Sequence, residues 1–320
     1  MKNKLTEVQT NPFPHSDTNR RFYTFDYFLR KKFGGKVAKI PLDGGFTCPN
    51  LDGTKGVGGC IYCSARGSGD FAPEARLSVT EQFAKGVASL SDKWNPVGFI
   101  PYFQAHTNTY APVEHLRALF EEAIAQSGVV GLSVATRADC ISPAIADLLR
   151  ELAGKTFLTV ELGLQTVHDR TAGLINRCHT YEEFLKGYRL LEGLDVCIHL
   201  IEGLPGETYE DMMETARRVA ELRPFAVKLH LLHILQNTAL ADIWERGEYT
   251  PMELADYVRV VCDSLEVLPP DTVIERVTGD GPPDSLLAPI WSRKKFVVMN
   301  EIDKELYRRD SYQGRHYLSE

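Results

Sequence analysis

The sequence of 320 residues lacks a long hydrophobic run, since no apolar stretch approaches the roughly 18–20 residues of a membrane-spanning helix. Residues 1–17 are polar, so the N-terminus also lacks the apolar segment of a secretory signal peptide. The seven cysteines are odd in number and come without an export signal, which argues against a disulfide framework. These absences predict a globular cytoplasmic protein with no membrane partner.

The chain also has fewer basic than acidic residues. The chain has 36 Lys and Arg against 43 Asp and Glu, a net charge of −7 at pH 7, which disfavours non-specific nucleic-acid binding by the whole surface. Two stretches, residues 20–33 and 291–317, nevertheless interleave basic and aromatic side chains. Such a stretch could contact phosphates and stack on bases, or it could be an amphipathic helix whose aromatic side chains pack inward. Taken singly, we favour the packed helix for each.

The most distinctive stretch is the glycine-rich segment 46–71, which holds Cys48, Cys60 and Cys63. Eleven residues separate the first two cysteines and two separate the last pair. Glycine lets the backbone adopt left-handed or crowded conformations, so this loop can wrap round a group and direct several thiolates at it. Three thiolates suit either zinc or an iron–sulfur cluster. The segment is called the cysteine loop below.

Zinc and an iron–sulfur cluster differ in the number of protein ligands that they require. A closed zinc site takes a fourth ligand, and the sequence has no second C-x-x-C to supply one, only the distant candidates His106 and Cys140. A [4Fe–4S] cluster held by three cysteines leaves one iron open for a small molecule. The spacing therefore favours a cluster, with zinc as the alternative.

Beyond the cysteine loop, strands and helices alternate. Short apolar runs predict strands at residues 36–42, 97–103, 129–135, 157–162, 196–201 and 225–232. Amphipathic segments predict helices at residues 79–90, 112–126, 143–152, 181–192 and 209–222. Repeated βαβ units of this kind form an α/β fold with a parallel sheet. The sheet is either an incomplete TIM-like (β/α)6 barrel or a doubly wound open sheet, and both bind ligands at the carboxyl ends of the strands.

The same rhythm predicts three regions. Residues 1–35 form an N-terminal extension, and residues 36–235 form the partial barrel. Residues 236–320 form a C-terminal helical subdomain or cover, with helices predicted at residues 239–246 and 252–265 and one more strand at 273–277.

Short polar motifs follow the predicted strands. They are TRAD at 136–139, ELGLQT at 161–166, NRCHT at 176–180 and IEGLPGET at 201–208. With the cysteine loop, they resemble the radical S-adenosylmethionine (radical SAM) superfamily. The chain looks like the branch that includes the radical SAM domain of the elongator catalytic subunit, elongator-like bacterial proteins and, more distantly, oxygen-independent coproporphyrinogen oxidase. Most of the superfamily has a much shorter gap between the first two cysteines, and the long gap here is similar to that of the elongator-like branch.

The resemblance implies a set of cofactor ligands. Cys48, Cys60 and Cys63 would hold a [4Fe–4S] cluster, and S-adenosylmethionine would bind its open iron. Tyr62 would lie near the adenine. The remaining implied contacts are Gln104, Ala105 and Thr107 to the methionine amino group, Gln165 and Arg177 to its carboxylate, and Thr136, His199 and Ile201 to the ribose and adenine. His199 has an alternative interpretation as an ordinary residue of the barrel interior.

The resemblance also implies a reaction. An electron from an external flavodoxin- or ferredoxin-type donor would cleave S-adenosylmethionine to a 5′-deoxyadenosyl radical, which would abstract hydrogen from a substrate carbon. The elongator-like branch implies that this substrate is transfer RNA, modified at a wobble uridine. A radical SAM enzyme of small metabolites and a non-catalytic zinc-stabilised binding protein remain alternatives. Candidate substrate contacts, each equally interpretable as a structural hydrogen-bonding residue, are Lys228, His230, His233, Gln236, Arg276 and Asp280.

Overall fold

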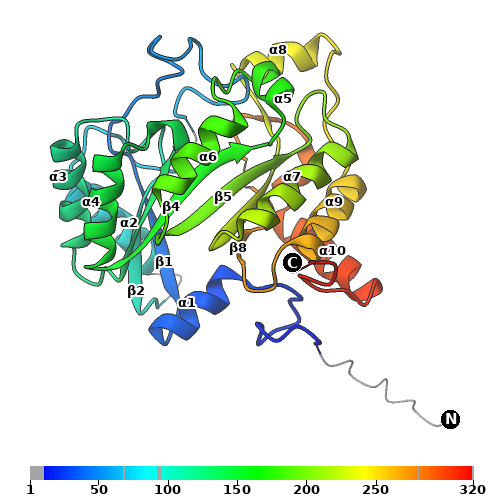
Figure 1. Cartoon of the computed structure of the whole chain (residues 1–320), viewed down its shortest axis with the longest axis horizontal. Helices are drawn as coiled ribbons and strands as arrows, with labels where there is room; N and C mark the ends of the chain where they lie inside the picture. Colours follow the sequence, from blue (N-terminus) through cyan, green and yellow to red (C-terminus); the bar gives the residue numbers. More distant parts are fainter. Residues whose placement is uncertain (1–10, 68, 92–94, 280, 319–320) are drawn as a thin grey trace.

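The computed structural model describes residues 11–67, 69–91, 95–279 and 281–318. Its centre is one curled sheet of seven parallel strands that follow one another in the order of the sequence (Figure 1). A doubly wound sheet would reverse its strand order part-way, so the sequential order identifies the incomplete barrel. The strands are β1 (Val37–Leu42), β2 (Gly98–Phe103), β3 (Gly131–Thr136), β4 (Phe157–Gln165), β5 (Asp195–Glu202), β6 (Ala226–Leu231) and β8 (Val273–Arg276).

The prediction of a parallel α/β partial barrel is confirmed, and the seventh strand extends it. All six predicted strands are present, with ends shifted by up to three residues. The strand predicted at 273–277 is β8, which pairs with β6 as the last strand of the same sheet. One segment of the predicted C-terminal region therefore contributes to the barrel itself.

Helices cover the convex face of the sheet, which explains the two-sided burial of the strands (Figure 1). In β4, Val160 and Leu162 face the helices and are fully buried, while Glu161 between them faces the barrel interior. The strands therefore carry apolar residues outward and polar residues inward. The covering helices are α2 (Val79–Ser91), α3 (Val113–Ile124), α4 (Pro143–Ala153), α6 (Tyr181–Leu190), α7 (Tyr209–Leu222) and α9 (Leu254–Val267).

Side-chain caps define where several helices begin. Ser142 accepts a hydrogen bond from the backbone N–H of Ile145 at the start of α4. Thr180 and Glu183 form a reciprocal capping box at the start of α6, which satisfies two otherwise unpaired backbone N–H groups. Each cap fixes the residue at which a helix begins. The TRAD and NRCHT motifs, which come just before α4 and α6, therefore keep their positions near the ends of the strands.

The amino-terminal end of the barrel is closed by α1 (Phe25–Phe33). Phe25 and Leu29 pack there against Val37, Cys197 and Ala226. The arginines of this stretch are paired within the chain: Arg30 contacts Asp17 at 2.7 Å and Asp26 at 2.9 Å, and Arg20 and Arg21 each pair with an aspartate near the C-terminus. For residues 20–33, the packed-helix interpretation fits the structure.

The rest of the chain flanks the barrel. A two-stranded ladder joins β7 (Ile234–Leu235) to β9 (Leu286–Ala288), and α10 (Lys295–Arg308) packs on α9. Two short helices lie at the strand-end side of the molecule, α5 (Asp169–Leu174) and α8 (Ala239–Glu245). Among the described residues, no helix is long and apolar enough to span a membrane.

Candidate active site

A cavity of about 730 Å³ lies inside the curled sheet, a size common for small-molecule sites. All seven parallel strands contribute to its wall. Its mouth is formed by the cysteine loop, which follows β1 and crosses the carboxyl ends of the strands. The parallel sheet therefore brings the segments that sequence motifs had singled out to one place.

The three predicted cluster ligands line this cavity together. Cys48, Cys60 and Cys63 are half-buried, and the backbone N–H of Cys63 donates to the carbonyl of Cys60 in a tight turn. The hydrogen bond with Cys63, together with the positive charge of Arg137, lowers the pKa of Cys60 to about 7 despite its burial. The amide of Asn50 also donates to the Cys60 sulfur at 3.7 Å. Such surroundings favour a thiolate at Cys60, whereas the same contact and burial raise the pKa of Cys63 well above its usual value.

This donor set fits the iron–sulfur cluster predicted from the sequence. A [4Fe–4S] cluster takes each thiolate on a different iron, so its three ligands need not converge on one point. In the described part of the chain, no three His, Cys, Asp or Glu side chains are arranged round a single ion. Of the two candidate fourth ligands for zinc, His106 lines the cavity, and Cys140 lies outside its lining.

The predicted S-adenosylmethionine contacts also gather in the cavity, with one exception. Ala105 is fully buried behind the wall, where Gly69 of the cysteine loop packs so closely that an added Cβ would lie 2.6 Å from the Ala105 methyl group. The eight residues that line the cavity are Tyr62, Gln104, Thr107, Thr136, Gln165, Arg177, His199 and Ile201.

Gln165 shows why its motif contains glycine. The backbone of Gln165 is left-handed, with φ of 64°, and its side chain folds back over Gly163. A Cβ added at Gly163 would lie 2.5 Å from the Gln165 amide nitrogen. Glycine in ELGLQT therefore makes room for the glutamine side chain at the end of β4.

Arg177 is engaged differently from the role implied by the resemblance. Its guanidinium is buried and donates to three backbone carbonyls, those of Leu164, Thr166 at 2.7 Å and His179 at 2.9–3.0 Å. These bonds hold the NRCHT segment against the end of β4. A bidentate contact with a carboxylate would have to share donors that the backbone already occupies.

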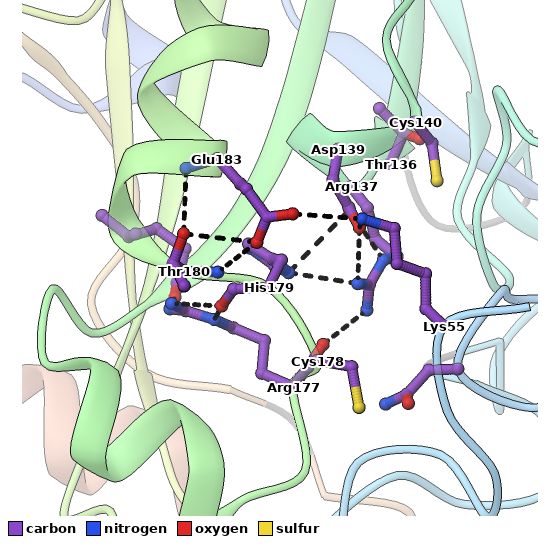
Figure 2. A network of polar contacts seen from close by, with 12 residues as sticks. Lys55, Thr136, Arg137, Asp139, Cys140, Arg177, Cys178, His179, Thr180 and Glu183 are labelled. Carbon is purple, nitrogen blue, oxygen red and sulfur yellow. Dashed lines mark hydrogen bonds and ion pairs between the residues drawn. The ribbon is translucent and has the colours of Figure 1, made fainter.

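A second arginine organises the neighbouring motif (Figure 2). Arg137 of TRAD makes a two-pronged ion pair with Asp139, at 2.9 and 3.0 Å, and donates to the backbone carbonyl of Arg177. Lys55 of the cysteine loop reaches the same carboxylate at 3.3 Å and Glu183 of α6 at 3.2 Å. Sequence reasoning had assigned no role to Lys55, whose only signal was its place in the long gap between the cysteines.

The long gap is docked to the NRCHT segment by a pair of asparagines. The side-chain amide of Asn176 donates to the carbonyls of Val57 at 3.0 Å and Gly59 at 2.7 Å. In return, the fully buried Asn50 donates to the backbone carbonyl of Asn176. The eleven-residue gap is therefore a folded segment with its own partners, which set the direction of Cys48 and Cys60.

The cavity also holds a buried group of charges, of which the sequence had indicated only Lys228 and His199. Glu161 pairs with Lys39 at 2.7 Å and with Lys228, and its Oε2 lies 2.8 Å from His199 Nε2. Tyr102 donates to the same carboxylate at 2.7 Å. Burial alone would raise the pKa of Glu161, but the two ammonium groups bring it well below the usual range. His199 is thus both a barrel-interior residue and part of the cavity wall.

The candidate substrate contacts divide into those that line the cavity and those that do not. Lys228, His230, His233 and Arg276 line it. Gln236 is exposed and outside the lining, and Asp280 lies outside the described residues.

Comparison with known proteins agrees with these features. The radical SAM superfamily matches residues 54–219, and the Radical_SAM C-terminal domain matches residues 224–308. The uncharacterized protein YtqA of Bacillus subtilis is 48% identical over 312 residues, which cover 97% of each chain. The tRNA uridine(34) acetyltransferase of Methanocaldococcus jannaschii is 29% identical over 164 residues, 49% of this chain and 30% of that protein.

A solved structure gives the same fold. Elp3 of Methanocaldococcus infernus, with an N-terminal deletion, superposes with a TM-score of 0.66 at 20% sequence identity, covering 87% of this chain and 64% of the other. The elongator-like resemblance expected from the sequence is thereby confirmed. With half of its length matched and its cysteine loop at the strand ends, the chain belongs to the radical SAM superfamily and is an enzyme that uses a [4Fe–4S] cluster and S-adenosylmethionine.

Proposed function

We propose that this enzyme modifies a uridine of transfer RNA, with Cys48, Cys60 and Cys63 as its cluster ligands. The observation that carries the proposal is the shared cavity, which three thiols and eight predicted S-adenosylmethionine contacts line together. When bound, the two cofactors supply a 5′-deoxyadenosyl radical that abstracts hydrogen from the substrate.

The residues of the cavity would bind and orient the cofactors. The backbone and side chains of Gln104 and Thr107 would meet the methionine amino group, and Gln165 its carboxylate. Tyr62 would lie beside the adenine. Arg137, whose positive charge acts on Cys48 and Cys60, would offset the negative charge of the thiolates. The enclosing barrel keeps water and unintended reactants away from a reactive radical.

Two similarities support transfer RNA as the substrate. One relative that matches half of the chain is a tRNA uridine(34) acetyltransferase, and the fold is that of an Elp3 structure. The apolar side chains Leu51 and Phe71 at the cavity mouth are 43% and 50% exposed, as suits contact with unstacked bases.

The first experiment tests the cofactors. The protein reconstituted anaerobically with iron and sulfide should be brown and, once reduced, should convert S-adenosylmethionine to 5′-deoxyadenosine. A colourless protein that retains zinc and leaves S-adenosylmethionine intact would support the zinc-stabilised alternative and overturn the proposal.

The second experiment tests the substrate. Modified nucleosides of bulk tRNA should differ between a deletion strain and the same strain carrying the intact gene, and the Cys60→Ala gene should not restore the difference. Identical profiles would overturn the tRNA assignment and favour a small metabolite.

A further inference from the structure

The wall of the cavity holds, on β8, a buried carboxylate oxygen with no hydrogen-bond partner among the described residues. The side chain of Glu275 on β8 is 2% exposed, and its Oε2 pairs with Lys39 at 2.7 Å and Lys228 at 3.4 Å. Its Oε1 is buried and accepts no hydrogen bond from any residue that the structure describes. A buried acceptor without a donor is costly, so this atom calls for a ligand that donates to it.

The same wall contains a second buried polar atom. Nε2 of His230 on β6 is buried and has no hydrogen-bond partner within the described ranges. The ring lies 5.2 Å from that of His199. Burial lowers the pKa of His230 well below its usual value, so the ring is neutral, and one of its nitrogens can donate to a carbonyl oxygen.

The charges around these two atoms restrict the ligand. A cationic donor approaching Glu275 would be repelled by Lys39 and Lys228, which are already paired with the carboxylates. An anion would face Glu275 Oε1 and the fully buried Glu161. A neutral N–H group meets neither penalty, because it satisfies the carboxylate without bringing another charge into a buried site.

From this arrangement we infer that the wall of the cavity formed by β6 and β8 binds the imide edge of a uracil-type base, with its N3–H donating to Glu275 and a ring carbonyl accepting from His230. Uracil presents a donor between two acceptors on that edge, which matches an acceptor beside a donor in the wall. Cytosine has an acceptor at N3, and this atom would repel the carboxylate of Glu275.

The inference rests on the proposed function, since it identifies the part of the substrate that this enzyme grips. It assigns Glu275 and His230 to substrate recognition, and places the base beside His199 and Ile201, two of the predicted S-adenosylmethionine contacts. The base would enter past Leu51 and Phe71 at the mouth.

The test measures binding of oligouridylate, oligo(3-methyluridylate) and oligocytidylate to the reconstituted holoenzyme with S-adenosylmethionine present. We expect oligouridylate to bind at least tenfold more tightly than the other two. Methylation at N3 removes the N–H donor, and cytosine has an acceptor at N3 in place of that donor. Equal affinities, or no binding of oligouridylate, would overturn the inference.

Variants locate the effect. Glu275→Gln and His230→Phe should each weaken oligouridylate binding about tenfold, while the iron content after reconstitution, which reports that each variant folds, stays close to wild type. Glu248→Gln, the same change at an exposed carboxylate, serves as the matched control. Undiminished binding in both cavity variants would overturn the assignment of these residues.

The two proposals fail in different ways. A holoenzyme that cleaves S-adenosylmethionine but does not distinguish uridine from 3-methyluridine defeats only the recognition of the base. A protein that neither binds a cluster nor cleaves S-adenosylmethionine defeats the proposed function itself.

Discussion

Cys60 shows how neighbours adjust one side chain for metal binding. The hydrogen bond with Cys63 and the charge of Arg137 favour its thiolate, and thiolate is the form that binds iron. By contrast, burial raises the pKa of Cys140 to about 12. Two cysteines on neighbouring segments therefore have opposite chemical tendencies, which no spacing in the sequence reveals.

Replacing Cys60 should abolish the cluster without unfolding the protein. In Cys60→Ala, we expect iron per chain to fall to near zero after anaerobic reconstitution, since a ligand is lost, while the circular dichroism spectrum stays that of the wild type. Cys140→Ala is the matched control and should retain full iron. Iron retained by Cys60→Ala, or lost equally from both variants, would contradict the ligand assignment.

Glu202 at the end of β5 links stability to pH. Burial raises the pKa of its carboxyl group to about 8, and Glu207 adds to the effect. The unfolded chain releases this proton near pH 4.5, so the folded state holds one more proton between these values. The contribution of Glu202 to stability is therefore full below about pH 4.5 and is lost as the pH rises toward 8.

Glu202→Gln isolates this contribution, because glutamine stays neutral at every pH. The melting temperature of the variant relative to the wild type should rise between pH 5 and pH 8. The wild type and variant are compared in the same buffers, so that other titrating groups cancel. A difference that does not change with pH would show that Glu202 has an ordinary pKa.

At the scale of elements, the cysteine loop depends on the segment after β4. Asn176 has a left-handed backbone, with φ of 54°, and donates two hydrogen bonds to the loop. The loop in turn extends to α6 through Lys55 and to α8 through the carbonyl of Ile61, which accepts from Leu240. The cluster ligands are thus positioned by elements more than a hundred residues away in the sequence.

Asn176→Gly tests this dependence, because glycine keeps the left-handed backbone and removes only the side-chain bonds. We expect iron release to a chelator to be about tenfold faster, since each lost hydrogen bond contributes about 1 kcal/mol to holding the loop. Asn237→Gly is the matched control, since Asn237 is also left-handed, with φ of 60°, and makes no side-chain hydrogen bond with the described residues. Equal release rates in the two variants would show that the loop holds the cluster unaided.

On the scale of the whole molecule, a segment near the start of the described chain and one near its end meet beneath the barrel, at Tyr23 and Gln313. Gln313 is fully buried there, and its amide donates to the carbonyls of Pro269 at 2.6 Å and Thr272 at 2.7 Å. Its side-chain oxygen accepts from the backbone N–H of Tyr23 at 2.8 Å. One side chain therefore joins the N-terminal segment, the turn before β8 and the C-terminal segment.

Gln313→Ala should destabilise the fold strongly, because three buried backbone groups lose their partner at once. We expect the free energy of unfolding, measured by denaturant titration, to fall by about 3 kcal/mol. Arg315→Ala, two residues on and exposed, should change it by less than about 0.5 kcal/mol. A loss as small as that of the control would mean that the ends of the chain contribute little to stability.

Much of this protein follows from local sequence. The apolar runs and amphipathic spacings predicted the parallel strands and most of the covering helices, because a strand or helix buried on one face must repeat its apolar residues with a fixed period. The three cysteines and the strand-end motifs predicted the family and the side of the sheet on which the cavity opens, since parallel strands end on one side of the sheet. The short helix α5 was missed, as it has no side-chain cap. The long α10 lies within residues 291–317, for which the packed-helix interpretation was favoured, and it buries Val298, Ile302 and Leu306 at a spacing of four.

Only the tertiary structure decided how these residues are used. Arg177 turned out to bind backbone carbonyls, because the curvature of the sheet brings the end of β4 against it. Lys39, Glu161, Lys228 and Glu275 form one buried cluster, although they come from four strands and have no common motif. Period and spacing determine which face a side chain takes, but the partner that it meets across the barrel depends on the closure of the whole sheet, and that closure left Glu275 Oε1 buried without a hydrogen-bond partner among the described residues.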